Sequence, residues 1–207
     1  MQLTRLPLTT GVSGTLPIAN GGTNVTSAAD LANTGNLVLL NSGTLSSVTS
    51  FEFDNTYITD TYKFYEVNFS FYTGTNNFQF YLQTSTDNGS NYASTSTSYA
   101  WTFTTVGTQG SFAGLFDQDD TAIVLGDSLS DGAGFPVSGR VRIMNPTDSA
   151  IATTFQSLCV GFHQSNDDVK QLNVFGRRQA TEDNNAIKIT SSQTMTSGHY
   201  ALYGVKQ

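Results

Sequence analysis

The stretch Tyr62-Lys63-Phe64-Tyr65-Glu66-Val67-Asn68-Phe69-Ser70-Phe71-Tyr72-Thr73 decides the fold class of this chain. Between Tyr65 and Phe71, aromatic or aliphatic side chains occupy every second position and polar side chains fill the positions between them. Successive side chains of a β-strand point to opposite faces of the sheet. The alternation therefore predicts a strand with one buried face and one polar face.

The same period-2 pattern recurs on both sides of this stretch. The expected inward-facing sets are Phe51 and Phe53; Phe78, Phe80 and Leu82; Tyr99, Trp101 and Phe103; Phe135, Val137, Val141 and Ile143; Leu172 and Val174; Ile187 and Ile189; and a last strand over Tyr200 to Val205. Turn-forming clusters separate these strands. From residue 37 onward the pattern predicts nine or ten strands and no long helix. The expected fold is all-β, an antiparallel two-sheet β-sandwich that is jelly-roll-like.

One predicted strand changes phase. Phe155 fits the odd positions of its segment, whereas Leu158, Val160 and Phe162 fit the even ones. One extra residue near Ser157 would restore a single buried face, so the pattern predicts a β-bulge there.

The chain carries little charge. Charged residues make up 12% of its 207 residues, about half the usual quarter, and the net charge is −7. With nine basic residues there are few cations to neutralise phosphates, so we expect no nucleic-acid partner. No apolar run approaches the roughly 18 residues of a membrane-spanning helix, and the start does not resemble a secretion signal. We therefore expect a soluble protein with no membrane insertion. A single cysteine excludes an intramolecular disulfide and a metal site built from several thiolates.

Residues 1–36 lack both strand and helix periodicity. Their apolar residues stand singly, and Pro7 and Pro17 favour extended conformations in the residues before them. Only Ser27–Asn33 fits a short helix, with Ser27 as its N-cap and Gly35 as its stop. The sequence thus predicts an extended leader over residues 1–36, containing one short helix, and a β-sandwich head over residues 37–207.

No residue pattern predicts catalysis. His163 and His199 are isolated, with no second ligand at zinc spacing. Cys159 and His163 would lie about 13 Å apart on a strand, too far for a thiol–imidazole pair, so we expect Cys159 in the core. Glu52 and Glu66 are the strand carboxylates a glycosidase could use, but both fall on polar faces. We expect no enzyme activity, no catalytic residue and no cofactor.

Two acidic segments are candidates for a cation. Asp127–Gly132 has the first, fifth and sixth residues of an EF-hand loop but a leucine at the third position. Asp117, Asp119 and Asp120 are expected to form a second acidic loop. Solvated turns explain both segments, so no metal site is predicted. A bound cation at Asp117/Asp119/Asp120 or at Asp127/Asp131 stays open as the alternative.

Three segments resemble known proteins. Gly14-Thr15-Leu16-Pro17-Ile18-Ala19-Asn20-Gly21-Gly22-Thr23-Asn24, followed by the Ala-rich Ser27–Asn33, resembles the Gly-Thr-Leu-Pro-Val-Ala-Asn-Gly-Gly-Thr-Gly leader and short helix of bacteriophage tail fibres. Asn24 replaces the last glycine of that pattern, and asparagine also tolerates positive φ. Ser197–Lys206 resembles the last strand of small phage structural proteins. Ser85–Tyr92 resembles the Asp-box turn of sialidases, and its single occurrence argues against a propeller.

The leader resemblance implies a homotrimeric virion protein, a tail fibre or receptor-binding fibre. Residues implied in attachment and trimerisation are Leu16, Pro17, Ile18, Ala19, Asn20, Gly21, Gly22 and Thr23. The implied partners are other phage tail or baseplate proteins and a host cell-surface glycan, whose contact residues the resemblance does not identify. A capsid head fibre or decoration protein is the first alternative, and a glycan-degrading depolymerase is the second. The expected location is the virion, in its tail.

Overall fold

The computed structural model of the chain describes residues 36–107, 112–130, 134–163 and 168–206. The chain divides into two units, Met1–Val38 and Leu39–Gln207, and the second unit is described by itself. The leader residues Leu16–Thr23 and the short helix expected at Ser27–Asn33 lie outside the described residues.

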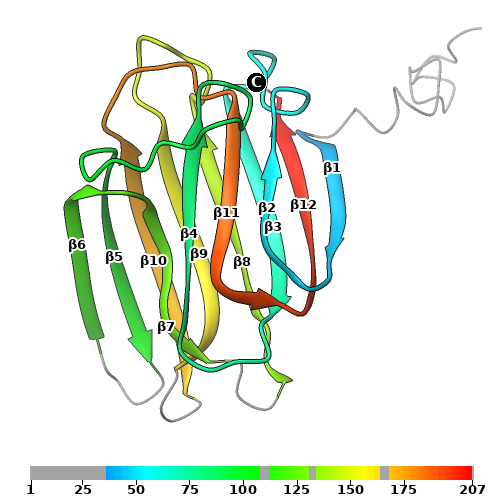
Figure 1. Cartoon of the computed structure of the whole chain (residues 1–207), viewed down its shortest axis with the longest axis vertical. Coiled ribbons are helices and arrows are strands. Elements are labelled where there is room, and N and C mark those ends of the chain that lie inside the picture. Colours follow the sequence, from blue (N-terminus) through cyan, green and yellow to red (C-terminus); the bar gives the residue numbers. More distant parts are fainter. Residues whose placement is uncertain (1–35, 108–111, 131–133, 164–167, 207) are drawn as a thin grey trace, which may run out of the picture. The chain divides into compact units, whose positions relative to one another are not determined.

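The described residues form twelve strands and no α-helix (Figure 1). The strands are β1 (Leu37–Leu45), β2 (Val48–Phe53), β3 (Phe64–Tyr72), β4 (Phe78–Ser85), β5 (Tyr99–Gly107), β6 (Phe112–Asp120), β7 (Ile123–Ser130), β8 (Val137–Met144), β9 (Thr154–His163), β10 (Val169–Arg178), β11 (Ala186–Met195) and β12 (Ser197–Val205). The prediction of an all-β, antiparallel fold is confirmed.

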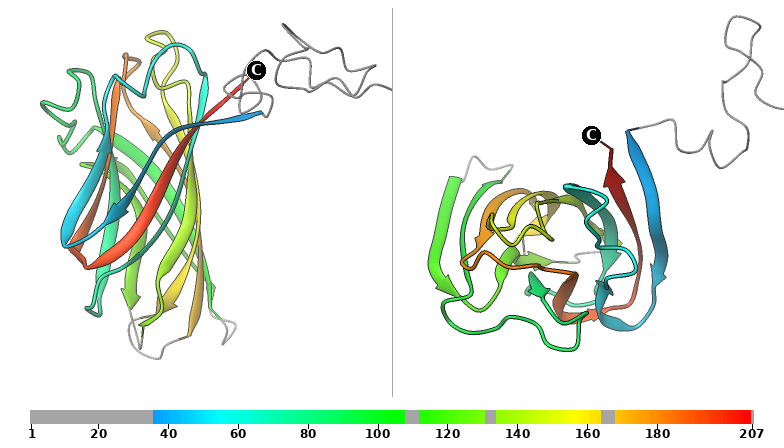
Figure 2. Two further views of the ribbon diagram at one scale, coloured as in Figure 1. Left: turned by 90° about the vertical axis from the view of Figure 1, so that its right-hand side faces the viewer. Right: turned by 90° about the horizontal axis from the view of Figure 1, so that it is seen from above.

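The strands pair into a nearly closed, barrel-like shell (Figure 2). One wall runs in the order β1-β12-β3-β8-β9-β10-β5-β6 and the other in the order β7-β4-β11-β2. The walls are joined where the end of β9 pairs with β7 as well as with β10, at Leu129↔His163 and Ser130↔Phe162. β7 and β9, which only β8 separates in the sequence, are therefore neighbours at this corner.

The core lies between the two walls and is rich in aromatic rings. Phe69 and Phe71 of β3 each meet Phe80 of β4 edge-on, with ring centroids 5.6 Å apart. Phe51 of β2 stacks on Tyr200 of β12 at 4.9 Å. Burying one such ring contributes about 2–3 kcal/mol. The inward positions predicted for β3 are all buried, so the alternation identified the correct face.

The predicted bulge near Ser157 is wrong. β9 keeps an unbroken register with β8 and with β10 through this residue. Ser157, Cys159 and Gly161 point inward, and Leu158 and Val160 are exposed on the outer face. The phase change came from small residues on the buried face and large apolar residues on the outer one.

The acidic loop expected at Asp117, Asp119 and Asp120 is also wrong. These residues form the end of β6, which pairs with β5 from Val106↔Phe112 to Tyr99↔Asp120. Every residue of β6 except Asp120 is exposed, so the strand has no buried face. Its sequence therefore lacks the alternation by which the other strands were recognised.

Candidate functional site

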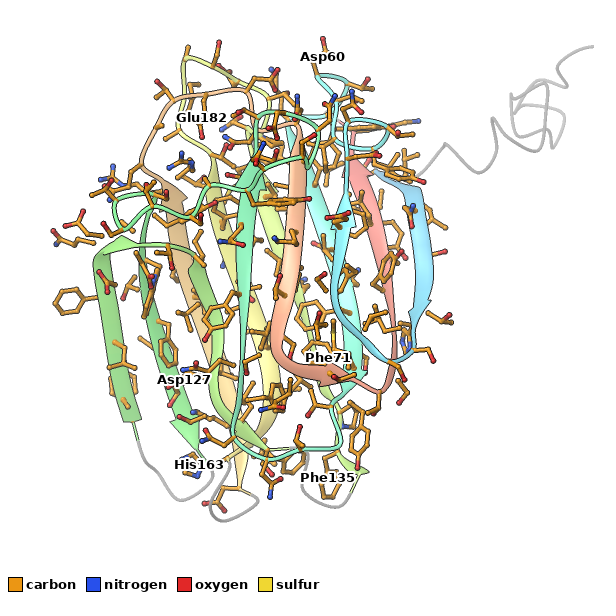
Figure 3. The ribbon with its side chains drawn as sticks, in the orientation of Figure 1. Asp60, Phe71, Asp127, Phe135, His163 and Glu182 are labelled. Atoms are coloured by element: carbon orange, nitrogen blue, oxygen red, sulfur yellow. The ribbon has the colours of Figure 1, made fainter. Side chains whose placement is uncertain are left out.

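A cavity of about 490 Å³ lies at one end of the head, between β7 and the inner face of β5, β6 and β10. The polar residues that line it include Asp127, Ser128, His163, Asp168 and Lys170, and the apolar ones are Phe103, Ala113 and Leu115. Figure 3 shows Asp127 and His163 at this end, with Asp60 and Glu182 at the opposite end. The volume is in the range of small-ligand sites.

A β-bulge in β7 places Asp127. Phe78 pairs with Leu129 and Phe80 with Gly126, so Asp127 and Ser128 together oppose one residue of β4. Ser128 has a φ of 52°, the left-handed conformation typical of such a bulge. The Asp127 carboxylate accepts hydrogen bonds from the Gln79 side-chain amide and, at 3.1 Å, from the Ser128 hydroxyl. The bulge thus turns a carboxylate toward the cavity and fixes its orientation.

Lys170 is a buried cation at the base of this cavity. Its ammonium donates a hydrogen bond to the backbone carbonyl of Asp127 at 2.7 Å. In register it lies between Gly107 of β5 and Gly161 of β9. Burial lowers the pKa of Lys170, and the nearby Asp127 charge opposes that effect. The ammonium therefore links β10 to β7 directly under the cavity.

His163 and Asp168 are placed by the end of the β9–β10 pair. The His163 backbone N–H donates to the Asp168 carbonyl at 2.9 Å. Both residues line the cavity, together with the Thr105 side chain from β5. Carboxylates, hydroxyls and an imidazole thus converge beside the partly exposed Leu115 side chain, an arrangement that can accept and donate hydrogen bonds to a polar ligand with an apolar face.

Cys159 lies in the core, as expected, and does not line this cavity. Its thiol is buried in the core, 3.1 Å from the Ser157 hydroxyl, and burial raises its pKa to about 12. A thiol in this state carries almost no thiolate at neutral pH. Cys159 is therefore a packing residue.

The two strand carboxylates considered for a glycosidase hold structural interactions on separate strands. Glu66 of β3 forms an ion pair with Arg142 of β8 at 3.0 Å. Glu52 of β2 accepts a hydrogen bond from the Tyr92 hydroxyl at 2.9 Å, and the Lys188 ammonium lies 4.0 Å from the centroid of the Tyr92 ring. The Tyr92 pKa is raised by burial and by the neighbouring Glu52. Each carboxylate thus interacts with different side chains, and the two do not form a pair.

The Asp-box-like segment Ser85–Tyr92 forms a turn that is closed by its own hydrogen bonds. The Asp87 carboxylate accepts from the Asn91 side chain at 2.7 Å, from the Ser85 hydroxyl at 2.7 Å and from the Asn91 backbone at 2.8 Å. These bonds, those of the Asn91 and Ser85 side chains above all, lower the pKa of Asp87 to about 2. The turn fixes the direction in which the chain leaves β4.

The acidic segments do not form metal sites within the described residues. Asp127 lies inside β7 and not in a loop, and Asp131 lies outside the described residues. In that same part of the chain, no group of three or more His, Cys, Asp or Glu residues is placed to hold a metal ion. His199 lies on β12, away from the cavity lining, beside Ser70 of β3 in register.

Sequence reasoning missed Lys170 and Asp168. Lys170 shares the inward phase of Leu172 and Val174, and a charged residue on an otherwise apolar face was the available signal. The sequence carried no comparable signal for Asp168, because its position depends on the end of the β9–β10 pair.

No family model, curated protein or solved structure matched this chain when it was compared with each. Among the described residues, no helix has the length and apolar character needed to cross a membrane. The fold and the cavity therefore define the protein only as an all-β head with a polar cavity at one end.

Proposed function

We propose that this chain is a structural protein of a bacteriophage virion, a non-enzymatic tail fibre. In this proposal residues 1–36 attach the protein to the particle as a homotrimer, through contacts with other tail or baseplate proteins, and residues 37–207 form a head that binds the host surface. The observation that carries the proposal is the leader segment Gly14–Asn24, which resembles the leader of tail fibres. Isolated apolar side chains in an extended leader gain burial when three copies wrap together.

We further propose that the head is a jelly-roll sandwich. β1 pairs with β12, β2 with β11, β3 with β8 and β4 with β7. These pairs are nested, so the chain follows the path of one long antiparallel hairpin rolled into two walls. In this scheme the paired strands β5–β6 and β9–β10 are two inserted hairpins that widen one wall. Jelly rolls are common in viral and lectin domains, which supports a surface-exposed binding head.

The cavity beside Lys170 is our candidate for the glycan contact. Sugar hydroxyls are donors as well as acceptors, and the Asp127 and Asp168 carboxylates and the Ser128 hydroxyl supply matching groups. The apolar faces of sugar rings match the exposed side of Leu115. Single glycan contacts are weak, and a trimer presenting three equal sites gains avidity of about 10² to 10⁴.

The test is the position of the chain in the intact particle. Cryo-electron microscopy should place density for the head on the tail, at a site with threefold symmetry. Density on the capsid shell would replace this proposal by a head fibre or decoration protein. Release of oligosaccharides from host polysaccharide by the purified protein would replace it by a depolymerase.

A further inference from the structure

The charged side chains of the cavity at the end of the head carry a net negative charge. Among the described residues that line this cavity, they are Asp127 of β7, Asp168 directly before β10, and Lys170 of β10. With histidine counted as neutral, two carboxylates and one ammonium leave one negative charge uncompensated. The lining therefore favours a ligand that is neutral or positively charged.

The positive charge of the lining lies deeper than the two negative charges. Lys170 is 7% exposed, whereas Asp127 and Asp168 are each partly exposed. The Lys170 side chain starts on β10, and its ammonium donates to the backbone carbonyl of Asp127 on β7 at 2.7 Å. Little of Lys170 is thus left for a ligand to touch. A ligand in the cavity meets carboxylate oxygens instead.

The hydrogen bonds of Asp127 leave acceptor sites for a ligand that donates. One carboxylate oxygen accepts from the Gln79 amide and the other from the Ser128 hydroxyl. An ionised carboxylate has about four acceptor sites and no proton to donate, so further sites remain. Ligand hydroxyl or ammonium groups can fill these sites. An ionised carboxylate or sulfate has no proton to donate and is repelled, the more strongly where water is excluded.

The charge of the whole chain has the same sign as the charge of the cavity lining. The net charge of the chain is −7. Like charges repel over roughly the Debye length, about 10 Å at 0.1 M salt, and this repulsion slows the association of a ligand. An acidic polysaccharide is therefore disfavoured during its approach as well as inside the cavity.

We propose that this cavity binds a sugar without negative charge and excludes acidic sugars, and that Asp127 and Asp168 determine this specificity. The inference rests on the glycan contact of the proposed function and narrows it to a substrate class. Neutral sugars and amino sugars belong to the class, because their hydroxyl or ammonium groups donate to the carboxylates. Uronic acids, sialic acids and sulfated sugars are excluded from it.

The experiment measures binding of small sugars to the full-length protein by ligand-observed nuclear magnetic resonance. The probes are pairs that differ only at carbon 6: methyl glucoside with methyl glucuronide, and methyl galactoside with methyl galacturonide. In at least one pair the neutral sugar should bind. Its acidic partner should require at least about a tenfold higher concentration for the same occupancy, because like-charge contacts cost more than such a factor. Ala113→Trp should abolish binding of the neutral sugar, because Ala113 lines the cavity.

A matched pair of variants separates the cavity charge from the charge of the whole molecule. Asp168→Asn removes one negative charge from the lining at almost unchanged size. This variant should reduce the ratio of acidic to neutral dissociation constants by at least about threefold. Asp60→Asn removes the same charge from an exposed position at the opposite end of the head (Figure 3). This control should leave the ratio unchanged. Near-ultraviolet circular dichroism checks that each variant is folded.

The outcomes distinguish this inference from the proposed function. An acidic sugar that binds as tightly as its neutral partner would overturn the specificity and leave the glycan contact in place. An equal change of the ratio in Asp168→Asn and Asp60→Asn would assign the discrimination to the whole molecule and overturn the role of the cavity. Absence of binding by all of these sugars, or binding that persists in Ala113→Trp, would reject the cavity as a glycan site without bearing on the position of the chain in the particle.

Discussion

Single residues decide how tightly the two walls meet, and Gly126 of β7 is the clearest case. A Cβ added there would overlap the Phe80 ring and lie 2.8 Å from a methyl group of Leu129. We expect Gly126→Ala to reduce the free energy of unfolding by about 1–3 kcal/mol, because the overpacked β7 must shift. Urea unfolding followed by Trp101 fluorescence measures the change.

Gly114 of β6 is the matched control for this substitution. The nearest atom to its added Cβ is the Phe103 carbonyl oxygen at 3.9 Å, so alanine fits without a shift. We expect Gly114→Ala to change stability by no more than about 0.5–1 kcal/mol, in the stabilising direction, because alanine restricts the unfolded chain. Equal destabilisation by both substitutions would contradict the packing argument.

Residue type alone predicted the buried faces only where large apolar residues point inward. Phe51 and Phe53 and the alternating residues of β3 satisfied this condition, and their faces were predicted correctly. In β9 the inward positions hold Ser157 and Gly161, whose small size leaves room for neighbouring strands. The large residues Leu158 and Val160 point outward instead, which a rule based on burial within one chain does not predict.

Among the elements, β6 and β7 are the strands whose structure the sequence pattern did not predict. β6 lacks a buried face, and β7 contains a bulge at Asp127 and Ser128 that only the register with β4 defines. The candidate site is lined by these two strands, by the inner face of β5, by Lys170 of β10, and by His163 and Asp168 at the end of the β9–β10 pair. The fold class could therefore be predicted, whereas the cavity depended on long-range pairing between β4, β7, β9 and β10.

The cavity between these elements can be filled to test its role. Ala113 of β6 lines it and is exposed, so Ala113→Trp should occupy the space without disturbing the core. We expect purified wild-type protein to reduce adsorption of the phage to its host, and Ala113→Trp to require at least a tenfold higher concentration for the same reduction.

The control for the filled cavity is Asn55→Trp, in the exposed turn after β2. It adds the same side chain in the β2–β3 connection, whose Asp60 lies at the opposite end of the head (Figure 3). This variant should reduce phage adsorption at the same concentration as the wild type. Both variants should have the same mass in solution as the wild type, which shows that their assembly is unchanged. If Ala113→Trp competes as well as the wild type, the cavity is not part of the receptor-binding site.

At the scale of the whole molecule, the sequence did not predict the order of the strands. Period 2 shows that a segment is a strand but not which strand lies beside it, and the pairs β1–β12 and β2–β11 join the two ends of the head. Closing such distant pairs costs entropy that only the finished core offsets. The aromatic contacts between Phe51 and Tyr200 belong to that core and form only when both ends have met.

Removal of residues 1–36 tests whether the head folds without the leader and whether the leader attaches the protein to the particle. All buried core residues of the described chain lie between Leu45 and Leu202, so the truncated protein should fold with the same near-ultraviolet circular dichroism and unfold cooperatively. The same truncation should abolish incorporation into particles, because the leader is the proposed attachment segment. Phage assembled with the truncated chain, purified and probed by immunoblot, provides the measurement. A truncated protein that fails to fold would reject the boundary at residue 36, and a folded one that still enters particles would transfer the attachment role to the head.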